Sequence, residues 1–397
     1  MGYFFGRVFR FSPLFLFLFF WMWYSSSPYF LYSCDDFSKG FVFIRVIIGI
    51  IILLYYNSVI SMVMILFILV SFILLRLLWF LIVFEFILVP ICLIIWAGVR
   101  GERFIGALYL LLFTLLFSVP FFLCVFKNIE EGFIGTSTIN LINFSLEISI
   151  LAIFVFITKY PVFLLHRWLP RAHVEAPTVG SIILAACILK LGSYGFLRFF
   201  PSLFLNFSFF FLVGVFGSLC SVILCITRRD LKALIAYSRV FHISYLFRGR
   251  FLIRERRILG VVSISCAHGF VAALMFFLIG SIYESTGSRS ILLIRFISLG
   301  SVIRQIWFIL IYLNFGIPIS LPFISEILIC GQWVFFSWTS SLLLFMALVL
   351  SGCFCLFWLF SIIGRKGTFL SQKSGLLEFV CIILLLIWSF FLWVVVF

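Results

Sequence analysis

Four charged side chains interrupt the apolar runs of this 397-residue chain at positions where a membrane helix rarely holds a charge. Glu85 lies in the run LIVFEFILVP, and Glu326 ends the stretch NFGIPISLPFISE. Lys159 and Lys190 each lie about 20 Å from the expected start of their helices, at roughly 1.5 Å per residue, which is near the middle of a bilayer. Because each buried charge costs roughly 2.5–3.5 kcal/mol to insert, a purely structural role for all four is disfavoured.

These four groups are chemically suited to proton transfer. Burial disfavours the charged form of a lysine and of a carboxylate, so both exchange protons more readily near neutral pH than they do in water. Arginine cannot take this role, because it does not release its proton. We therefore interpret Lys159 and Lys190 as exchangeable proton sites, and a static buried salt bridge between Glu85 and a lysine is the alternative.

The four histidines add groups that titrate near neutral pH. His242 lies in AYSRVFHIS and His268 in SCAHGFVAAL, and we interpret both as proton-relay positions. His166 and His173 are seven residues apart and would share one face of a continuous helix, but Pro170 makes such a helix doubtful. No further cluster of ligands completes a metal site around this pair, so no metal is expected and a membrane metalloenzyme is disfavoured.

The composition excludes a soluble protein. Hydrophobic residues make up 65% of the chain and charged residues 10%, whereas soluble domains carry about 25% charged residues. The net charge of +15 comes from basic residues in short loops such as RGER, TRRDLK and GRKG. This distribution indicates anchors at the membrane surface rather than a nucleic-acid interface. The eleven cysteines include no C-x-x-C pair, so redox chemistry is expected on other chains.

The elements that must position the ionisable residues are membrane helices. The apolar runs predict about thirteen of them, at residues 9–24, 41–56, 58–76, 77–97, 104–126, 143–168, 177–198, 205–226, 230–247, 258–282, 296–330, 334–360 and 376–397. Two spans are irregular, because 143–168 contains KYP and 296–330 is too long for one crossing and contains two prolines. Two broken helices in one bundle are typical of transporters, where the unwound segments offer polar backbone at membrane depth.

One long segment carries a family resemblance. The stretch LHRWLPRAHVEAPTVGSIILAACILKLGSYG is similar to the signature of the antiporter-like, proton-pumping membrane subunits of respiratory complex I, and of its subunit 4 family in particular. The segments FEFILVP, RRDLKALIAYS, AHGFVAALMFFLIGSIYESTGSR and NFGIPISLPFISE agree in the same order. The resemblance covers roughly residues 80–330, and the flanking helices are apolar without a specific motif.

The resemblance implies an all-α polytopic membrane protein, an antiporter-like bundle of about 13–14 transmembrane helices. Such a bundle has two inverted repeats, each with one broken helix. It implies N-terminal helices over 1–76 that are shortened relative to the family, a proton-translocation core over 77–330, and C-terminal helices over 331–397.

The resemblance also implies roles for six residues. Glu85 is similar to the family's essential glutamate, paired with Lys159 of the first broken helix, and Lys190 to the lysine that connects the two halves. His242 and His268 resemble relay positions. Glu326 resembles the acidic end of the exit path.

The family function implies that this chain itself holds no cofactor. NADH, FMN, the iron–sulfur clusters and ubiquinone would lie on other subunits of the complex. The expected partners are other membrane-arm subunits, including neighbouring antiporter-like ones, and the lipid bilayer, with no nucleic acid. The expected location is the mitochondrial inner membrane, and the 58 phenylalanines suggest an organelle genome. A subunit of a multi-subunit cation/proton antiporter is the alternative, since it shares the fold and the buried lysines.

Two arginines depart from the family pattern. Arg239 stands where the family usually has a small polar residue, and Arg167 replaces an apolar one. On a helix over 237–245, Arg239 would lie about 5–6 Å from His242 at Cβ and would repel a proton held there. This effect depends on Arg239 staying in the bundle rather than extending to the membrane surface.

Overall fold

The computed structural model describes most of the central part of the chain. It covers residues 59–74, 77–97, 101–130, 146–199, 208–249, 255–291, 297–298, 301–316, 320–333, 338–363 and 368–369. The spans expected at 9–24, 41–56 and 376–397 lie outside these residues. The shortening of the N-terminal segment 1–76 therefore stays a prediction.

The described elements are almost all helices, in agreement with the fold class expected from the sequence. Before the first break they are α3 (Val59–Ile73), α4 (Leu77–Trp96), α5 (Gly101–Glu130) and α6 (Leu146–Lys159). After it come α7 (Trp168–Glu175), α8 (Thr178–Ile183), the π-helical segment η2 (Leu184–Ile188), α9 (Leu189–Phe199), α10 (Ser208–Thr227), α11 (Leu231–Gly249) and α12 (Glu255–Thr286). The remaining helices are α14 (Ser301–Phe315), α15 (Leu321–Trp333) and α16 (Trp338–Ile363).

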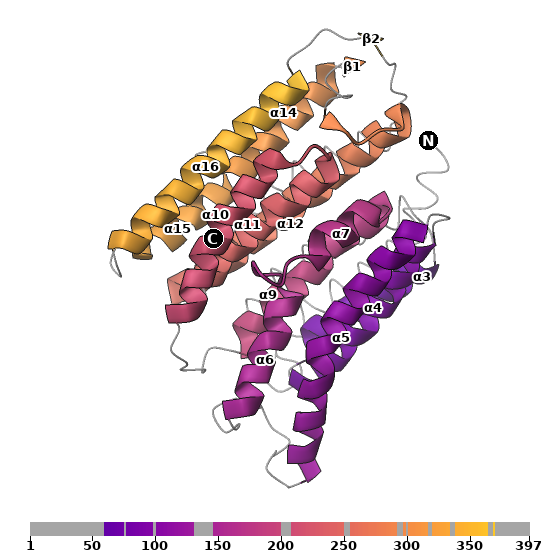
Figure 1. Cartoon of the computed structure of the whole chain (residues 1–397), viewed down its shortest axis with the longest axis vertical. Coiled ribbons are helices and arrows are strands. Elements are labelled where there is room, and N and C mark those ends of the chain that lie inside the picture. Colours follow the sequence, from indigo (N-terminus) through magenta and orange to yellow (C-terminus); the bar gives the residue numbers. More distant parts are fainter. Residues whose placement is uncertain are drawn as a thin grey trace, which may run out of the picture.

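Two short strands lie at one end of the bundle. They are β1 (Ile297–Ser298) and β2 (Thr368–Phe369), which pair in parallel, with Ile297 opposite Thr368. Figure 1 shows this pair beyond the ends of α14 and α16. It therefore joins two distant parts of the chain outside the helical bundle.

The first break lies between α6 and α7. α6 ends at Lys159, and Pro161 follows two residues later, where its ring prevents the helix from continuing. The chain turns through Leu164, which has a positive φ of 86°. Trp168 Nε1 donates to the Thr158 carbonyl at 3.0 Å and so satisfies a backbone acceptor that the break frees.

His166 and His173 do not share one continuous helix, as expected, but the reason is not Pro170. Pro170 is the third residue of α7 and does not interrupt it, whereas His166 lies before α7 begins. A proline in the first turn of a helix is tolerated, because the backbone N–H groups there have no partner within the helix. The helix is broken earlier, directly after Lys159.

The second break lies between α14 and α15. α14 ends at Phe315, and Gly316 follows with a positive φ of 78°, a conformation that glycine adopts without a side-chain clash. α15 begins at Leu321, with Pro322 in its first turn. The long span expected over 296–330 is therefore two helices, as its glycine and prolines predicted.

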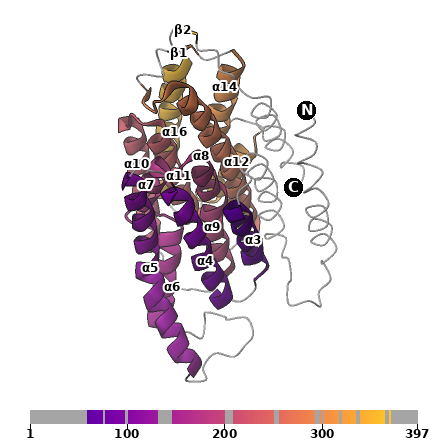
Figure 2. The ribbon, with the colours of Figure 1, turned by 90° about the vertical axis from the view of Figure 1, so that its right-hand side faces the viewer.

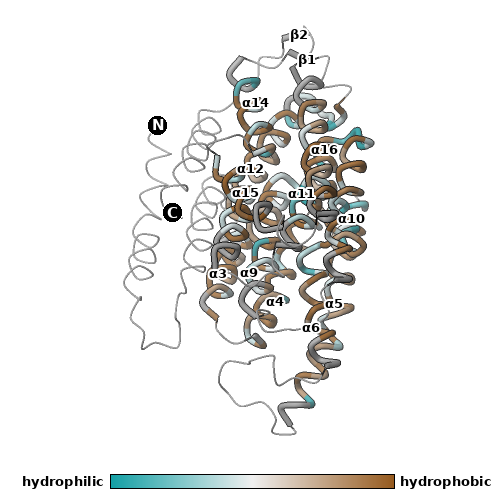
Figure 3. The backbone as a smooth tube through the Cα atoms, turned by 90° about the vertical axis from the view of Figure 1, so that its left-hand side faces the viewer, coloured by the Kyte–Doolittle hydropathy of each residue, from teal (hydrophilic) through white to brown (hydrophobic). Residues whose placement is uncertain are grey.

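The helices run side by side with nearly aligned axes (Figures 1 and 2). Figure 1 shows α3–α9 on one side of the molecule and α10–α16 on the other. The two sides meet where α12 packs against α8, η2 and α9, and where α11 packs against α7. Figure 3 shows that hydrophobic residues make up most of the described helices.

Among the described residues, four helical stretches are long and apolar enough to cross a membrane: Leu78–Trp96, Glu102–Lys127, Thr178–Phe196 and Gly260–Glu284. The last two are fully buried inside the bundle, whereas the α5 stretch exposes most of its surface. Leu112, Leu116 and Leu123 of α5 lie along one helix face and are 63%, 64% and 66% exposed. This apolar face suits contact with lipid, while α8, α9 and α12 form the protected centre.

Candidate functional site

A buried ion pair lies directly at the first break. Lys159 Nζ, at the end of α6, is 2.8 Å from Glu85 Oε1 of α4, and the two side chains are 0% and 16% exposed. The ammonium group also lies 4.2 Å from the centre of the Phe84 ring. The structure thus brings together the carboxylate and the lysine that the sequence analysis paired.

The end of α6 provides a favourable electrostatic position for Lys159. The last carbonyl groups of a helix carry partial negative charge, which stabilises a cation in the final turn. Tyr160 N still donates to Phe156 O at 2.7 Å, so the last turn closes before the chain leaves the helix. Lys159 is therefore held by its helix end, an aromatic ring and a carboxylate.

Gly192 brings the next helix against this break. A Cβ atom at position 192 would lie 2.9 Å from the Lys159 carbonyl oxygen, closer than side chains approach backbone in ordinary structures. The backbone of α9 therefore touches the end of α6 two residues after Lys190. This close approach places the helix of the second lysine beside the first lysine.

Lys190 lines a small cavity at the centre of the molecule. The cavity measures about 20 Å³, and its polar lining comes from Lys190, Ser238, Arg239, His242, His268 and Asn314. One water molecule needs roughly 10–15 Å³ of such space and two to four polar partners. The cavity is therefore large and polar enough to hold a water between the lysine and the histidines.

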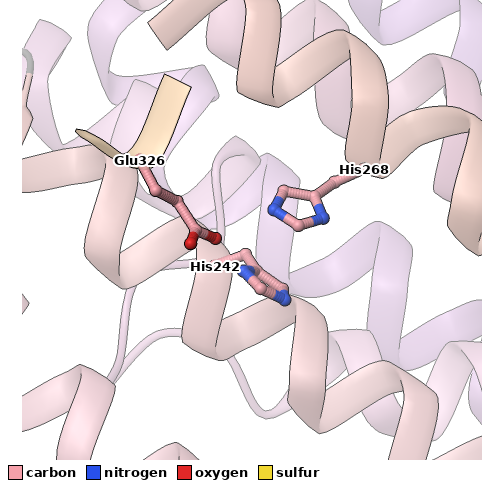
Figure 4. A group of neighbouring side chains, drawn as sticks. All are labelled: His242, His268 and Glu326. Atoms are coloured by element: carbon pink, nitrogen blue, oxygen red, sulfur yellow. The ribbon is translucent and has the colours of Figure 1, made fainter. Parts of the chain in front are cut away.

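His242 and His268 lie against each other, and Glu326 lies beside them. The two imidazole rings are 3.7 Å apart between centres and come from α11 and α12. One ligand atom of each of the three residues lies within 4.8 Å of the others. Figure 4 shows the three side chains pointing toward one another. The carboxylate also lies close to the second break, since a Cβ atom at Gly316 would be 3.0 Å from Glu326 Oε2.

His166 and His173 do not join this cluster. His166 precedes α7, stacks on Phe163 at 4.7 Å and meets the edge of the Tyr237 ring at 6.0 Å. His173 lies within α7 and stacks on Phe276 at 4.6 Å. Each has its own aromatic partner, so the two do not form a shared ligand set.

The two arginines that depart from the family pattern differ in exposure. Arg239 is 6% exposed, and its guanidinium lies 5.1 Å from the centre of the Phe276 ring, so it stays in the bundle. α11 is helical throughout, which places Arg239 and His242 on adjacent surface as expected. Arg167 is exposed in the turn before α7 and is a surface change.

Two cations that were not expected from the sequence support α7. Lys232 Nζ donates to the Ala176 carbonyl at 2.7 Å, and Arg289 Nη1 donates to the Val174 carbonyl at 2.6 Å. The interpretation of TRRDLK as a surface anchor is wrong for Lys232, which is 2% exposed. Basic groups stabilise the unpaired carbonyls at a helix C-terminus. One feature of the sequence could have indicated the buried position of Lys232. It lies in the first turn of α11, where the helix dipole disfavours a positive charge.

Comparisons with known proteins agree with this architecture. Residues 75–355 match the family model described as NADH:quinone oxidoreductase/Mrp antiporter, TM. The chain therefore belongs to this family of antiporter-like membrane subunits, as the motifs around Lys190 and Glu326 predicted.

Within the family, the chain is similar to NADH-ubiquinone oxidoreductase chain 4 of several animals. It is 34% identical to that of Caenorhabditis elegans over 287 residues, which are 72% of this chain and 69% of the nematode protein. It is 35% identical to that of Aedes aegypti and 37% identical to that of Arbacia lixula, matching 63% and 61% of their lengths. These matches include 69% and 67% of this chain.

Solved structures show the same fold. A chain of respiratory complex I from Thermus thermophilus with bound NADH superposes with a TM-score of 0.79 at 21% identity, over 91% of this chain and 81% of that chain. A chain of the Mrp complex from Dietzia sp. DQ12-45-1b superposes with a TM-score of 0.75 at 15% identity, over 86% and 69%. The protein is thus an antiporter-like membrane subunit of the complex I type.

Proposed function

We propose that this chain is a core subunit of the membrane arm of NADH:ubiquinone oxidoreductase and translocates protons. The observation that carries the proposal is the buried Lys159–Glu85 ion pair at a helix break. The proposed path continues through Lys190 to the contacting rings of His242 and His268 and ends at Glu326, all within the core over 77–330. The 32–37% identity to chain 4 proteins, over most of this chain, supports the assignment.

The first proposed step is the separation of the ion pair. An electrostatic change on a neighbouring subunit draws Glu85 away from Lys159, and the lysine then holds its proton less firmly. The close approach at Gly192 and the cavity beside Lys190 give the proton a short route to the second lysine. A water in that cavity would connect Lys190 to the histidine rings.

The attraction between Lys159 and Glu85 is large enough to account for the work of moving one proton across the membrane. With an effective dielectric near 20, two opposite charges at 2.8 Å attract each other by roughly 6 kcal/mol. Moving one charge against 100 mV requires about 2.3 kcal/mol. Partial separation of one ion pair can therefore drive one proton against a membrane potential.

The redox chemistry belongs to other subunits in this proposal. NADH, FMN, iron–sulfur clusters and ubiquinone bind elsewhere in the complex, and this chain contributes to the enzyme as a coupled proton translocator. Its partners are the other membrane-arm subunits, including neighbouring antiporter-like ones. The chain 4 relatives support a place in the mitochondrial inner membrane and an organelle gene.

The second candidate is a subunit of a multi-subunit cation/proton antiporter. The likeness to a chain of the Mrp complex favours it, with a TM-score of 0.75 at 15% identity. Native gel electrophoresis of solubilised membranes separates the two candidates. We expect NADH dehydrogenase activity to migrate with this chain, and migration of the chain in a complex without that activity would favour the antiporter.

A further inference from the structure

Three side chains from three helices converge beside the second break. They are His242 of α11, His268 of α12 and Glu326 of α15, and one ligand atom of each lies within 4.8 Å of the others (Figure 4). Two imidazole nitrogens and one carboxylate oxygen form a ligand set that holds Zn²⁺ in proteins, with water completing the coordination. The three residues are far apart in sequence, so no short sequence motif predicts this ligand set.

The ring nitrogens of the two histidines are available as ligands. His242 and His268 are 6% and 5% exposed. Both ring nitrogens of His268 lack a hydrogen-bond partner among the described residues, whereas His242 interacts with the side chain of Asn314. Buried polar atoms are nearly always paired, so such a group of orphan atoms calls for an explanation. A bound ion would satisfy one nitrogen of each ring at once.

The three ligand atoms lie close together, but farther apart than around a bound zinc ion. Zinc bonds to nitrogen and oxygen are about 2.0–2.2 Å long, so ligand atoms around a tetrahedral ion lie roughly 3.3–3.5 Å apart. The ligand atoms, which lie within 4.8 Å of one another, therefore need to approach by up to roughly 1.5 Å when the ion binds. The cavity of about 20 Å³ borders both histidines and gives space for the water ligand.

We propose that His242, His268 and Glu326 form a binding site for a divalent transition-metal ion, with Zn²⁺ as the preferred occupant. Imidazole and carboxylate donors favour zinc over Mg²⁺ and Ca²⁺, which require more oxygen ligands. Metal binding itself goes beyond the proposed function and does not depend on it. The consequence that a bound ion blocks proton transfer at these residues does rest on the proposed function.

Arg239 weakens this site. Arg239 lines the same cavity as the two histidines and Lys190, and a positive side chain repels a divalent cation. The Phe276 ring holds the guanidinium at 5.1 Å and keeps it in the bundle. Removal of this charge should therefore strengthen zinc binding, and a variant of Arg239 offers a test that leaves all three ligands in place.

The decisive experiment measures zinc in the intact membrane complex. The purified complex is incubated with zinc chloride, and density is sought between the three side chains by electron microscopy. Bound zinc is then titrated in the parent and in His268→Gln, with His166→Gln as a matched control, because His166 is also buried but lies outside the set. The difference between variants removes the contribution of zinc bound elsewhere in the complex.

The expected results are specific. The parent should show density at the three ligands, His268→Gln should bind zinc at least tenfold more weakly at this site, and Arg239→Ser at least tenfold more tightly. His166→Gln should match the parent. Zinc density elsewhere only, or equal zinc affinity in His268→Gln and His166→Gln, would overturn the proposal. If His268→Gln does not assemble, the density in the parent and the Arg239→Ser titration decide.

A second readout separates the metal site from the proposed function. Zinc should inhibit proton translocation by the parent with the same midpoint as its binding at this site. Zinc density at the three ligands without inhibition would uphold the metal site and contradict the proton path through His242 and His268.

Discussion

The two helix breaks hold charges of opposite sign in different surroundings. At the first, Lys159 ends the half-helix α6 and is paired with Glu85 at 2.8 Å. At the second, Glu326 lies in the second turn of α15 beside two histidine rings, and no cation of the described residues forms an ion pair with it. The first break is therefore electrostatically compensated, whereas the carboxylate at the second lies beside two imidazole groups, which can be neutral.

This difference suggests different tasks for the two breaks. Separating a compensated pair consumes electrostatic energy, and re-forming the pair releases it. A carboxylate beside imidazoles can take up or release a proton with a smaller change in charge interactions. The ion pair at the first break is suited to start proton transfer when it separates, and Glu326 at the second break is suited to accept a proton. The experiments below test this division of roles.

The largest effect is expected from Lys159→Met. Removal of one partner of a buried ion pair typically costs about 3–5 kcal/mol, because the other charge stays buried without compensation. We expect proton translocation per NADH oxidised to fall at least tenfold and the thermal stability of the complex to decrease. Vesicle acidification and a thermal-shift assay measure the two quantities.

The double variant Lys159→Met/Glu85→Gln separates stability from function. It leaves two neutral side chains of similar size, so stability should recover while pumping stays lost. Lys127→Met serves as a control, because Lys127 is exposed in the last turn of α5. Parent-like pumping in Lys159→Met would show that the first break is not the trigger.

A smaller structural effect is expected from Glu326→Gln. The substitution breaks no ion pair among the described residues, so we expect a stability change below about 1 kcal/mol. Pumping should still fall several-fold, because glutamine cannot carry the proton. The exposed Glu102→Gln variant is the matched control and should pump like the parent. A loss of stability as large as that of Lys159→Met would remove the contrast between the breaks.

The smallest effect on proton translocation is expected from Lys232→Met, which removes a cap from the second half of the first broken helix. The lost hydrogen bond to the Ala176 carbonyl should cost about 1–3 kcal/mol locally. Backbone amides of α7 should exchange with deuterium up to about a hundredfold faster, with little change in α15. Arg229→Met, an exposed change just before α11, should leave both exchange rates unchanged. Equally faster amide exchange in α15 would mean that the hydrogen bond from Lys232 stabilises the whole bundle rather than α7 alone.

The charged residues of the first break could be predicted from sequence, because the free-energy cost of a charge inside an apolar helix is evident from the neighbouring residues alone. A lysine or glutamate inside a long apolar run is expensive, so Glu85 and Lys159 stood out without any knowledge of the fold. The break at KYP was also predicted, because Pro161 cannot continue α6. Pro170, in contrast, looked disruptive between His166 and His173. Only its place in the first turn of α7 explains why it is tolerated.

The second cluster could not be predicted from residue spacing. His242, His268 and Glu326 come from three helices, and their closeness depends on how α11, α12 and α15 pack. Lys232 was missed for a related reason. Its partner carbonyl at Ala176 is 56 residues earlier in the chain, and loop position alone made it look like a surface anchor.

The contact at Gly192 has a genetic consequence. Every other amino acid carries a Cβ atom, and at this position that atom would lie 2.9 Å from the carbonyl oxygen of Lys159. No missense change of this codon avoids the collision, whatever the polarity or size of the new side chain. Even alanine would force α9 away from α6 and lengthen the distance between the two lysines. Inherited variation at this single codon should therefore be far less tolerated than at the lipid-facing leucines of α5.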